Sequence, residues 1–471
     1  MNPQPHLPGA RLQTYGDATA FLDSLVRTPP RTRDERERLG LLPVESLLER
    51  VGNPHHGLAA VHITGSKGKG STALYTEALL GAAGLRAGTF TSPHLEDWNE
   101  RIRVAGSPID RCEFVEALER IRPAVADLRR ADAKSAPAFF DALVAAAFSV
   151  FSEAPVDIAV IEAGIGARLD PTRACRAIAT CITGVELEHT ERLGPTVADI
   201  AREKAAIVRP GIPLVTGSMP EPARAVLEAE AVRAGAPLLR LGRDITIRLG
   251  DDLPSTGPAS GLPRHAHTGR PTGSLRETGP AEIVLSDRTV PVALRQPGRH
   301  MVENAALALA LADEIGTLRR LDDAAAGGAL EAAELPGRAE VLRESPLVIA
   351  DGAHTRTSIE ALVGTLEPRH TARLVAVVSV TRGKDAAHLL RPLVRHASIV
   401  VATAAEPSRS LSADALARVL TDSKPHIPIE VIPAPADAIR AAVRLAEEDG
   451  TVCVTGSMYL AGAARRTLLS G

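Results

Sequence analysis

Short apolar runs alternate with helix-like stretches over residues 59 to 215. The runs predict buried strands, and the stretches between them, such as residues 73–83, predict helices. The predicted strands are residues 59–64, 87–91, 157–162 and 177–183. This alternation is typical of a doubly wound parallel sheet. In such a sheet, ligands bind beyond the carboxyl ends of the strands.

A helix at residues 196–208 carries the clearest end signals. Thr196 can cap its first turn, and Asp199 stands where a capping box usually has glutamate. Pro210 and Gly211 then stop the helix. A further helix, residues 302–315, is apolar on most sides, which predicts that it is buried.

Residues 250–280 differ from the rest of the chain. They are rich in Pro, Gly, Ser and His and show no periodicity. We interpret them as a flexible insertion or a long loop.

The alternating pattern starts again near residue 335. Strands are predicted at residues 347–350, 374–380, 399–403, 429–432 and 452–455, with helices such as 386–396 and 436–448 between them. This predicts a second, smaller α/β domain of Rossmann-like type. We therefore expect two domains, residues 1–334 and 335–471, with a ligand cleft between them.

Composition restricts the classes of partner. Hydrophobic residues make up 45% and charged residues 24% of 471 residues, as in a soluble globular protein. A net charge of -3 and 2% aromatic residues argue against a nucleic-acid partner. No apolar run approaches the roughly 20 residues that span a bilayer, so we expect no membrane partner. Four scattered cysteines and a proline-containing, non-signal N-terminus favour the cytoplasm.

A glycine-rich turn links the strand 59–64 to the helix 73–83. It consists of Gly65, Ser66, Lys67, Gly68, Lys69, Gly70, Ser71 and Thr72. Glycines let main-chain amides surround a phosphate, Lys69 adds a charge, and Ser71 offers a hydroxyl to magnesium. The standard phosphate loop has glycine where Ile63 stands, so this is a shorter variant. The alternative is an ordinary glycine-rich turn.

Further polar clusters follow other predicted strands. Ser71, Ser92 and Glu162 supply hard oxygen atoms and His189 an imidazole, which suits magnesium beside a triphosphate. Two of these residues, and Lys204 on the predicted helix 196–208, each have a simpler interpretation. Glu162 could form a salt bridge with Arg168, His189 could be a satisfied polar residue, and Lys204 could be a solvated helix lysine.

In order along the chain, these motifs resemble the folylpolyglutamate synthase and dihydrofolate synthase family within the Mur ligases. The matching segments are Gly65–Thr72, Thr91-Ser92-Pro93-His94-Leu95, Asn99-Glu100-Arg101-Ile102-Arg103, Arg202-Glu203-Lys204-Ala205, Leu335-Pro336-Gly337-Arg338, Asp351-Gly352-Ala353-His354 and Gly456-Ser457-Met458-Tyr459-Leu460. The resemblance covers residues 60 to 465. It implies an ATP-dependent ligase that forms an amide through an acyl phosphate, with a folate or pteroate-type acid and L-glutamate as substrates. It also implies a monomer.

The resemblance implies roles residue by residue. Lys69 and the loop amides would hold the β- and γ-phosphates of ATP. Ser92 and Glu162 would bind one magnesium ion, and Glu162 and His189 a second. Lys204 would be carbamylated, which turns a cation into an anion near the metals.

Four further residues have implied roles. Asn304 would contact adenine. Arg338, Asp351 and His354 would reach ATP and the acyl phosphate from the second domain. Closure of the two domains would then exclude water from the acyl phosphate.

The chain departs from the family pattern at several positions. Ser66 and Lys67 replace Thr-Asn, Arg173 replaces asparagine, Glu186 replaces glycine and Met301 replaces glutamine. These changes motivate a second hypothesis, a related ligase for a non-folate carboxylate. Two other classes stay open: a P-loop NTPase switch, which leaves Lys204 unexplained, and a silent binding protein, although no key residue is missing.

Overall fold

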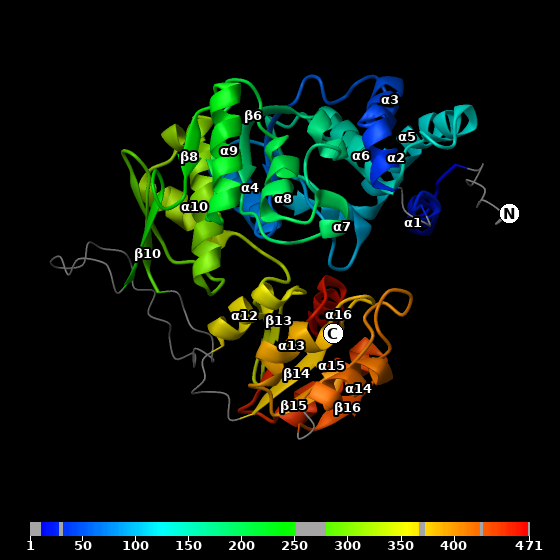
Figure 1. Cartoon of the computed structure of the whole chain (residues 1–471), viewed down its shortest axis with the longest axis vertical. Coiled ribbons are helices and arrows are strands. Elements are labelled where there is room, and N and C mark those ends of the chain that lie inside the picture. The colour runs from blue at the N-terminus through cyan, green and yellow to red at the C-terminus, as the bar shows by residue number, and fades with distance from the viewer. Residues whose placement is uncertain (1–10, 28–31, 251–278, 367–372, 424–426, 470–471) are drawn as a thin grey trace.

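The computed structural model describes residues 11–27, 32–250, 279–366, 373–423 and 427–469. The predicted insertion at 250–280 lies almost entirely outside these residues. Two units follow one another along the chain, an N-terminal unit from α1 to α11 and a C-terminal unit from β12 to α16 (Figure 1). No helix in the described segments is long and apolar enough to cross a bilayer.

The N-terminal unit is built on an eight-stranded sheet in the order β4-β3-β2-β5-β1-β6-β7-β8. Its strands are β1 Ala59–Thr64, β2 Ala87–Phe90, β3 Ile102–Val104, β4 Ser107–Pro108, β5 Ile158–Glu162, β6 Arg176–Ile182, β7 Leu214–Thr216 and β8 Leu238–Arg240. All pairs are parallel except those that involve β3 and β4. The prediction of a doubly wound, largely parallel sheet is confirmed. β1, which leads into the glycine-rich turn, lies between β5 and β6.

Helices cover both faces of this sheet. They are α1 Tyr15–Ser24, α2 Arg33–Leu39, α3 Leu42–Arg50, α4 Lys69–Ala82, α5 Arg111–Ala131, α6 Phe139–Glu153, α7 Thr190–Leu193, α8 Val197–Ala205, α9 Glu221–Ala234, α10 Arg299–Glu314 and α11 Asp323–Ala332. Helices α4 and α10 pack together in one apolar core, whereas α8 and α9 pack in another. The predicted burial of the helix near residue 302 is confirmed, because the apolar side chains of α10 fill the core beside α4.

The capping prediction for α8 is correct. The Oγ1 of Thr196 accepts a hydrogen bond from the amide of Asp199 at 3.1 Å, and the Asp199 carboxylate accepts one from the amide of Thr196. The helix ends at Ala205 rather than at residue 208. The last turn tightens, because the amides of Ile207 and Val208 bond to carbonyls three residues earlier.

A three-stranded antiparallel sheet is absent from the sequence prediction. It consists of β9 Thr246–Leu249, β10 Ala281–Val284 and β11 Thr289–Val292, in the order β11-β10-β9. Its strands have four residues each, so the alternation of more buried and more exposed side chains along them covers too few positions to be recognised in the sequence. They pack their apolar side against α10 and α11, in the same core as α4.

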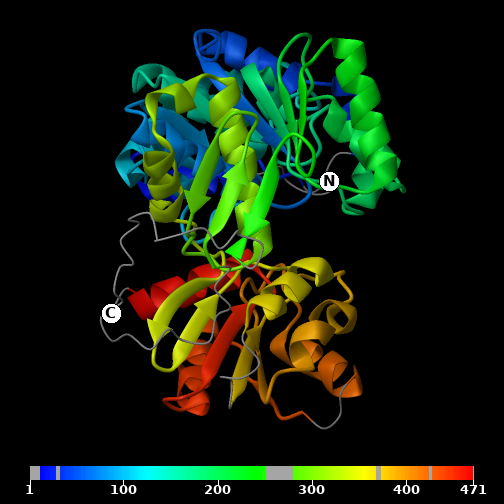
Figure 2. The same cartoon turned by 90° about the vertical axis from the view of Figure 1, so that its left-hand side faces the viewer.

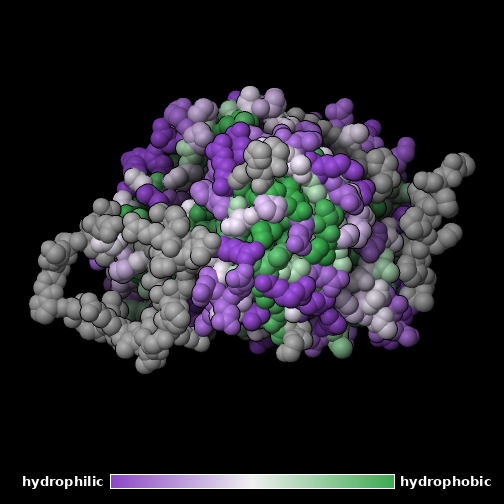
Figure 3. All heavy atoms as spheres, turned by 90° about the horizontal axis from the view of Figure 1, so that it is seen from below, coloured by the Kyte–Doolittle hydropathy of each residue, from purple (hydrophilic) through white to green (hydrophobic). Residues whose placement is uncertain are grey.

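The C-terminal unit contains a six-stranded sheet in the order β12-β13-β17-β14-β15-β16 (Figure 2). Its elements are β12 Glu340–Glu344, β13 Leu347–Ala350, α12 Arg356–Thr365, β14 Leu374–Val378, α13 Ala386–Val394, β15 Ile399–Ala402, α14 Ala413–Ser423, β16 Ile429–Val431, α15 Pro435–Ala446, β17 Thr451–Thr455 and α16 Met458–Leu469. Only the β12–β13 pair is antiparallel. The prediction of a Rossmann-like α/β unit is confirmed. Seen from below, this end of the molecule shows a hydrophobic area among hydrophilic side chains (Figure 3).

The loop after β2, in the N-terminal unit, packs against the C-terminal unit. The side chain of Leu95 packs in an apolar core of the C-terminal unit, and a Cβ on Gly462 would lie 2.0 Å from the Leu95 carbonyl oxygen. Arg465 of α16 forms an ion pair with Glu96 at 2.8 Å and another with Glu340. A domain boundary at 334/335 stays a prediction.

Candidate active site

The glycine-rich turn leaves β1 and becomes the first turn of α4 without an intervening loop. The amide of Thr72 already bonds to the carbonyl of Gly68 at 2.8 Å, so the helix begins at Lys69 rather than at residue 73. Gly65 and Gly68 both have positive φ, at 149° and 81°. Their missing side chains also make room, because a Cβ on Gly65 would lie 1.9 Å from Thr183 Oγ1. The expected order of strand, turn and helix is present.

Lys69 folds back over this turn. Its Nζ donates a hydrogen bond to the Gly65 carbonyl at 3.0 Å. Ser71 and Thr72 are buried just behind it, and the Oγ1 of Thr72 has no hydrogen-bond partner among the described residues. An ammonium group, buried hydroxyls and the positive end of α4 therefore meet at one point, as binding of an anionic phosphate requires.

The residues after β6 hold the other side of the turn. Ser66 donates its amide to the carbonyl of Gly184, and its hydroxyl accepts from the amide of Glu186, both at 2.9 Å. The hydroxyl of Thr183 donates to the carbonyl of Lys67. Burial lowers the pKa of the Lys67 ammonium, against the opposing effect of Glu188 and Glu186. Lys67 thus adds a second cation beside Lys69.

Asn304 of α10 lies directly against the turn. A Cβ on Gly68 would come within 2.2 Å of its Oδ1. The asparagine is buried, and it reaches the turn because α10 packs along α4. The structure therefore brings this predicted nucleotide contact next to the predicted phosphate site.

Glu162 ends β5 on the opposite side of the turn. Its Oε2 accepts the amide of Ser92 at 2.7 Å and lies 3.4 Å from where a Cβ on Gly70 would stand. The side chain is only 3% exposed, and burial raises its pKa although Lys69 opposes the shift. A salt bridge between Glu162 and Arg168 was the simpler alternative, and it is wrong. Arg168 pairs with Glu203 and Glu37 instead.

These residues fit a magnesium ion that takes its other ligands from phosphate and water. No group of three or more His, Cys, Asp or Glu side chains placed to hold a metal occurs among the described residues. Magnesium does not require one, because it is commonly bound by one or two carboxylates together with phosphate oxygens. Glu162, Ser71 and Ser92 supply hard oxygen atoms at the loop, so the donor set suits this ion.

His189 is the fourth residue of the predicted magnesium set, and Lys69 is among the charges that act on its pKa. It adopts φ 46° at the start of α7, and its Nδ1 lies 3.8 Å from Glu191 Oε1. About half of the side chain is exposed. Burial of the remainder lowers its pKa, although Glu188 acts in the opposite direction, so the imidazole is neutral at neutral pH.

Lys204 is 1% exposed and is not a solvated lysine. Its Nζ donates to Glu188 Oε1 at 3.0 Å. Burial lowers the pKa of Lys204 to about 8, against the opposing charge of Glu188 and with a contribution from Lys69. Burial acts to raise the pKa of Glu188, yet the charges of Lys204 and Lys69 hold it below its ordinary value. The sequence pattern of the Val185–Glu188 segment did not predict this pair.

Three predicted residues of the C-terminal unit gather where β12 begins and β13 ends. The Asp351 carboxylate accepts the amides of Ala339 and Ala353, each at 2.7 Å. Burial raises its pKa, and Arg338 opposes the shift. Burial also lowers the pKa of His354 to about 4. Arg338 acts in addition on Glu162 and opposes the rise in the pKa of that carboxyl, so the two units share one electrostatic site.

A buried cluster in the loop after β2 has no predicted role. Arg101 donates its Nε to His94 Nδ1 at 3.0 Å, and its guanidinium lies 4.8 Å from the ring centroid of Trp98. The centroid of the His94 ring lies 5.7 Å from that of Tyr459, on the C-terminal unit. Burial lowers the pKa of Arg101 to about 10. The sequence motifs contain these residues but do not predict their mutual contact.

A buried hydrogen-bond chain holds the turn that follows Glu162. The Asp170 carboxylate accepts the amides of Gly164 and Ile165 at 3.0 and 3.1 Å and the hydroxyl of Thr172. Because that hydroxyl donates to Asp170, it accepts from His62 Nε2, 2.9 Å away. Interactions that start inside β1 therefore fix the backbone next to Glu162.

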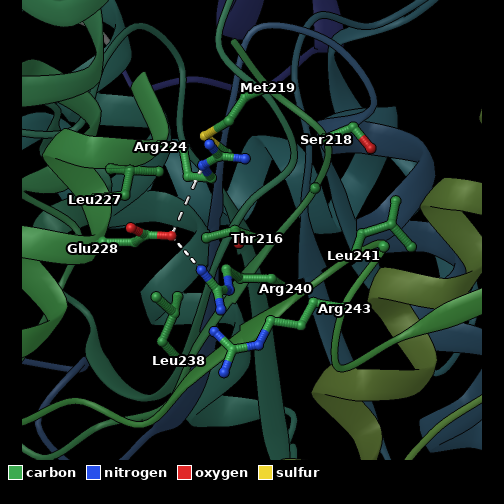
Figure 4. A pocket seen from close by; sticks show the side chains of 12 residues that line it. Thr216, Ser218, Met219, Arg224, Leu227, Glu228, Leu238, Arg240, Leu241 and Arg243 are labelled. Atoms are coloured by element: carbon green, nitrogen blue, oxygen red, sulfur yellow. Dashed lines mark hydrogen bonds and ion pairs between the residues drawn. The ribbon is translucent and has the colours of Figure 1, made fainter. Parts of the chain in front are cut away.

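A separate hollow of about 290 Å³ opens at the carboxyl ends of β7 and β8 (Figure 4). Glu228 of α9 faces both Arg240 and Arg224, 3.9 Å from the Nε of the latter. None of the predicted site residues lines this hollow.

Comparison with known proteins identifies the group to which this site belongs. The family model "Mur ligase, glutamate ligase domain" matches residues 337–458. The "Dihydrofolate synthase/folylpolyglutamate synthase" of Mycobacterium tuberculosis is 32% identical over 454 residues, which cover 90% of this chain and 89% of that protein. The chain belongs to the folylpolyglutamate synthase/dihydrofolate synthase family. It therefore belongs to a family of ATP-dependent ligases that form carbon–nitrogen bonds, as predicted.

A second relative is longer than this chain. The "Probable bifunctional folylpolyglutamate synthase/dihydropteroate synthase" of Halobacterium salinarum is 36% identical over 456 residues. The match covers 96% of this chain but 51% of that protein, so the chain spans about half of its length.

Solved structures of the family have the same fold. Mycobacterium tuberculosis folylpolyglutamate synthase complexed with ADP superimposes with a TM-score of 0.81 at 29% identity, over 96% of this chain and 99% of that one. E. coli FolC in complex with DHPP and ADP gives a TM-score of 0.78 at 26% identity, over 97% and 98%.

Proposed function

We propose that this ligase adds L-glutamate to a folate or pteroate-type acid at the expense of ATP. The observation that carries the proposal is the convergence at the glycine-rich turn. Glu162 and Asn304 reach the turn from distant parts of the chain, and Lys69 closes over it. The names of the relatives and the DHPP bound to E. coli FolC support a folate-type acceptor.

The reaction has two steps. The acceptor carboxylate attacks the γ-phosphorus of ATP, and the bond to ADP breaks, which leaves an acyl phosphate. The amine of glutamate then attacks the acyl carbon, phosphate leaves, and the amine proton goes to solvent or a nearby base. Lys69 and the loop amides hold the β- and γ-phosphates and stabilise the charge that develops on them.

Magnesium would supply further charge stabilisation at the phosphate oxygens. Ser71, Ser92, Glu162 and His189 would hold two such ions. The C-terminal unit contributes Arg338, Asp351 and His354 to ATP and the acyl phosphate, and Asn304 contacts adenine. Enclosure between the two units protects the acyl phosphate from water.

Lys204 is proposed to be carbamylated when the enzyme is active. Carbamylation requires a neutral amine, whose nitrogen attacks carbon dioxide and loses a proton. A buried lysine with a pKa of about 8 offers that amine far more readily than a solvated one. The ion pair with Glu188 favours the unmodified ammonium, so the two states compete.

A different carboxylate acceptor is the less favoured proposal. The sequence features that favour it are the departures from the family pattern at Arg173, Glu186 and Met301. Met301 is buried in the core, and Glu186 bonds to Ser66 through its backbone amide rather than its side chain. Arg173 lines a surface groove together with Arg168 and Arg202. These placements give no reason to prefer an unrelated acid.

We further propose a cytoplasmic monomer that acts on small molecules without a nucleic-acid or membrane partner. Cys112, Cys175, Cys181 and Cys453 are all free thiols, which suits a reducing compartment. The net charge of -3 offers no general attraction to nucleic acid or to anionic lipid.

The decisive test is the mass of the product. The purified chain is incubated with magnesium, ATP and glutamate, with dihydropteroate in one tube and tetrahydrofolate in another. A gain of one glutamate on dihydropteroate assigns the synthase step, and gains on tetrahydrofolate assign chain extension. No gain in either tube, with ATP binding intact, would refute the folate proposal.

A further inference from the structure

The last residues of β1 hold the turn that follows Glu162. The carbonyl of Ile63 accepts the amide of Ala163 at 2.8 Å. The hydroxyl of Thr64 donates to the carbonyl of Gly166 at 2.6 Å. β1 then leads directly into the glycine-rich turn. The strand that carries the phosphate loop therefore also fixes the backbone that follows Glu162.

His62, one residue earlier in β1, reaches the same turn through two other side chains. Its Nε2 lies 2.9 Å from the hydroxyl of Thr172, and this hydroxyl donates to the carboxylate of Asp170. That carboxylate in turn accepts the amides of Gly164 and Ile165. Burial raises the pKa of Asp170, and the hydrogen bonds from Thr172, Ile165 and Gly164 oppose the rise. The orientation of Asp170 therefore sets the position of the turn.

The imidazole of His62 is neutral and donates its one hydrogen to Thr172. The side chain is fully buried, and burial lowers its pKa to about 3, with contributions from the charges of Arg209 and Arg173. Because the hydroxyl of Thr172 donates to Asp170, the hydrogen between His62 and Thr172 belongs to Nε2. Nδ1 is then an acceptor, and it has no hydrogen-bond partner among the described residues.

A histidine at position 62 brings the core no evident gain in stability. A buried acceptor without a partner destabilises a fold. An aliphatic side chain would avoid this and would suit a position between Val61 and Ile63, which are both fully buried. A donor is useful here because it holds Thr172 and Asp170 in one orientation. The turn that His62 supports therefore explains the histidine better than core stability does.

We propose that His62 is a positioning residue for magnesium. Acting through Thr172 and Asp170, it holds the turn after Glu162 and keeps the Glu162 carboxylate directed at the phosphate loop. The inference rests on the proposed function, in which Glu162 is a magnesium ligand. Pairing of β5 with β1 and β2 fixes the backbone before Glu162, so the turn after it is the other support of this side chain. Groups that orient a metal ligand in this way commonly change metal affinity about 10- to 100-fold.

The test is calorimetric titration of magnesium chloride into the whole chain and its variants. His62→Leu removes the donor, whereas His62→Gln keeps an N–H group as many bonds from Cα as Nε2 of histidine. His55→Leu is the matched control. His55 is also buried, its Nδ1 also lacks a partner among the described residues, and its ring packs near Phe148.

We expect His62→Leu to bind magnesium about tenfold or more weakly. His62→Gln should restore most of the affinity, and His55→Leu should bind magnesium like wild type. ATP affinity without magnesium should be the same in all of these proteins. The thermal unfolding midpoint of His62→Leu should equal or exceed that of wild type, because the unpartnered acceptor is gone.

Thr172 provides an independent check, since it lies between His62 and Asp170. Thr172→Val should weaken magnesium binding as His62→Leu does, and Thr172→Ser, which keeps the hydroxyl, should not. This pair decides the question if a change at position 62 prevents folding.

Three results would overturn the proposal. The first is wild-type magnesium affinity in His62→Leu or, where that variant does not fold, in Thr172→Val. The second is equal weakening in His62→Leu and His62→Gln, which would show that the donor is not what matters. The third is a weakening that comes with a lower unfolding midpoint in His62→Leu, which would show that the histidine serves the fold.

The outcome for His62 is separate from the outcome for the proposed function. Magnesium binding is measured without folate or glutamate. The expected order of affinities in a protein that ligates no glutamate would therefore refute the proposed function and leave the role of His62 standing. Absence of magnesium binding in wild type would overturn the role of His62 and the magnesium site together.

Discussion

The Nζ of Lys204 lies 3.0 Å from Oε1 of Glu188, and both side chains face the site that contains Lys69. This pair sets the charge state of the buried lysine. Glu188 raises the pKa of Lys204, while burial, the larger effect, lowers it to about 8. Removing the carboxylate charge must therefore move the pKa of Lys204 further down.

Glu188→Gln is expected to increase carbamylation of Lys204. A larger fraction of neutral amine at a given pH gives more carbamate at a given concentration of carbon dioxide. The measurement is the carbamate signal in carbon-13 NMR after equilibration with labelled carbon dioxide, from about pH 7 to 9. Lys204→Ala is the control and must lack the signal. Absence of the signal from both wild type and the glutamine variant would refute carbamylation.

Lys204→Ala is expected to lose most ligase activity, about a hundredfold or more in kcat. If the missing group is a carbamate, a short-chain carboxylic acid that fills the cavity restores part of the activity. Full activity of Lys204→Ala without added acid would contradict any role for the modification.

Lys69→Ala is expected to reduce ligation severely and leave the fold intact. Among the described residues its ammonium makes one hydrogen bond, to the Gly65 carbonyl, so few contacts are lost. Its charge acts on the phosphates in the transition state, and we expect a loss of about 100- to 1,000-fold in kcat. Kinetics and thermal unfolding are measured together, with Lys134→Ala as a lysine control at an exposed position. Wild-type turnover in Lys69→Ala would remove the site assignment.

Glu162→Gln separates function from stability. The pKa of Glu162 is raised in the fold, so the native state binds the proton more tightly than the unfolded chain. The contribution of Glu162 to stability therefore falls as pH rises from its unfolded pKa to its folded pKa. Glutamine lacks this titration and can still accept the amide of Ser92. We expect equal or higher stability at neutral pH, weaker binding of magnesium measured by calorimetry, and strongly reduced activity. A marked loss of stability would show that the carboxylate mainly serves the fold.

The sequence predicted the central strands well because they are apolar on both faces. Residues 59–64 and 347–350 coincide with β1 and β13. The antiparallel sheet of β9 to β11 was missed, since its short strands are half-exposed and mixed in polarity. A hydrophobic pattern predicts a strand through the side chains that the strand buries. These short strands bury too few side chains for the pattern to be recognised.

In the candidate site, too, some features could be predicted from the sequence and others could not. Each predicted residue near the turn belongs to a motif with a familiar spacing, and the parallel sheet places the ends of β1 and β5 side by side. The pairs Lys204–Glu188 and Arg101–His94 needed the folded geometry, because they depend on the direction of individual side chains. His62 was likewise invisible within an apolar strand, although it bonds to Thr172.

The close approach of Gly68 to Asn304 can be tested with two glycines of one segment. A methyl group on Gly68 would meet Asn304 Oδ1 at 2.2 Å, and Gly68 has φ 81°, which disfavours any other residue. Gly81, within α4, has nothing within 4 Å of the position that a Cβ would occupy, and its backbone is helical. Gly81→Ala should therefore stabilise the fold by up to about 1 kcal/mol through helix propensity.

Gly68→Ala should lower the unfolding midpoint and weaken ATP binding by at least about tenfold, since both the turn and Asn304 must shift. The test is to measure the thermal unfolding midpoint and the ATP affinity of both variants. Equal ATP affinity in both would mean that Asn304 and the turn do not form one nucleotide site.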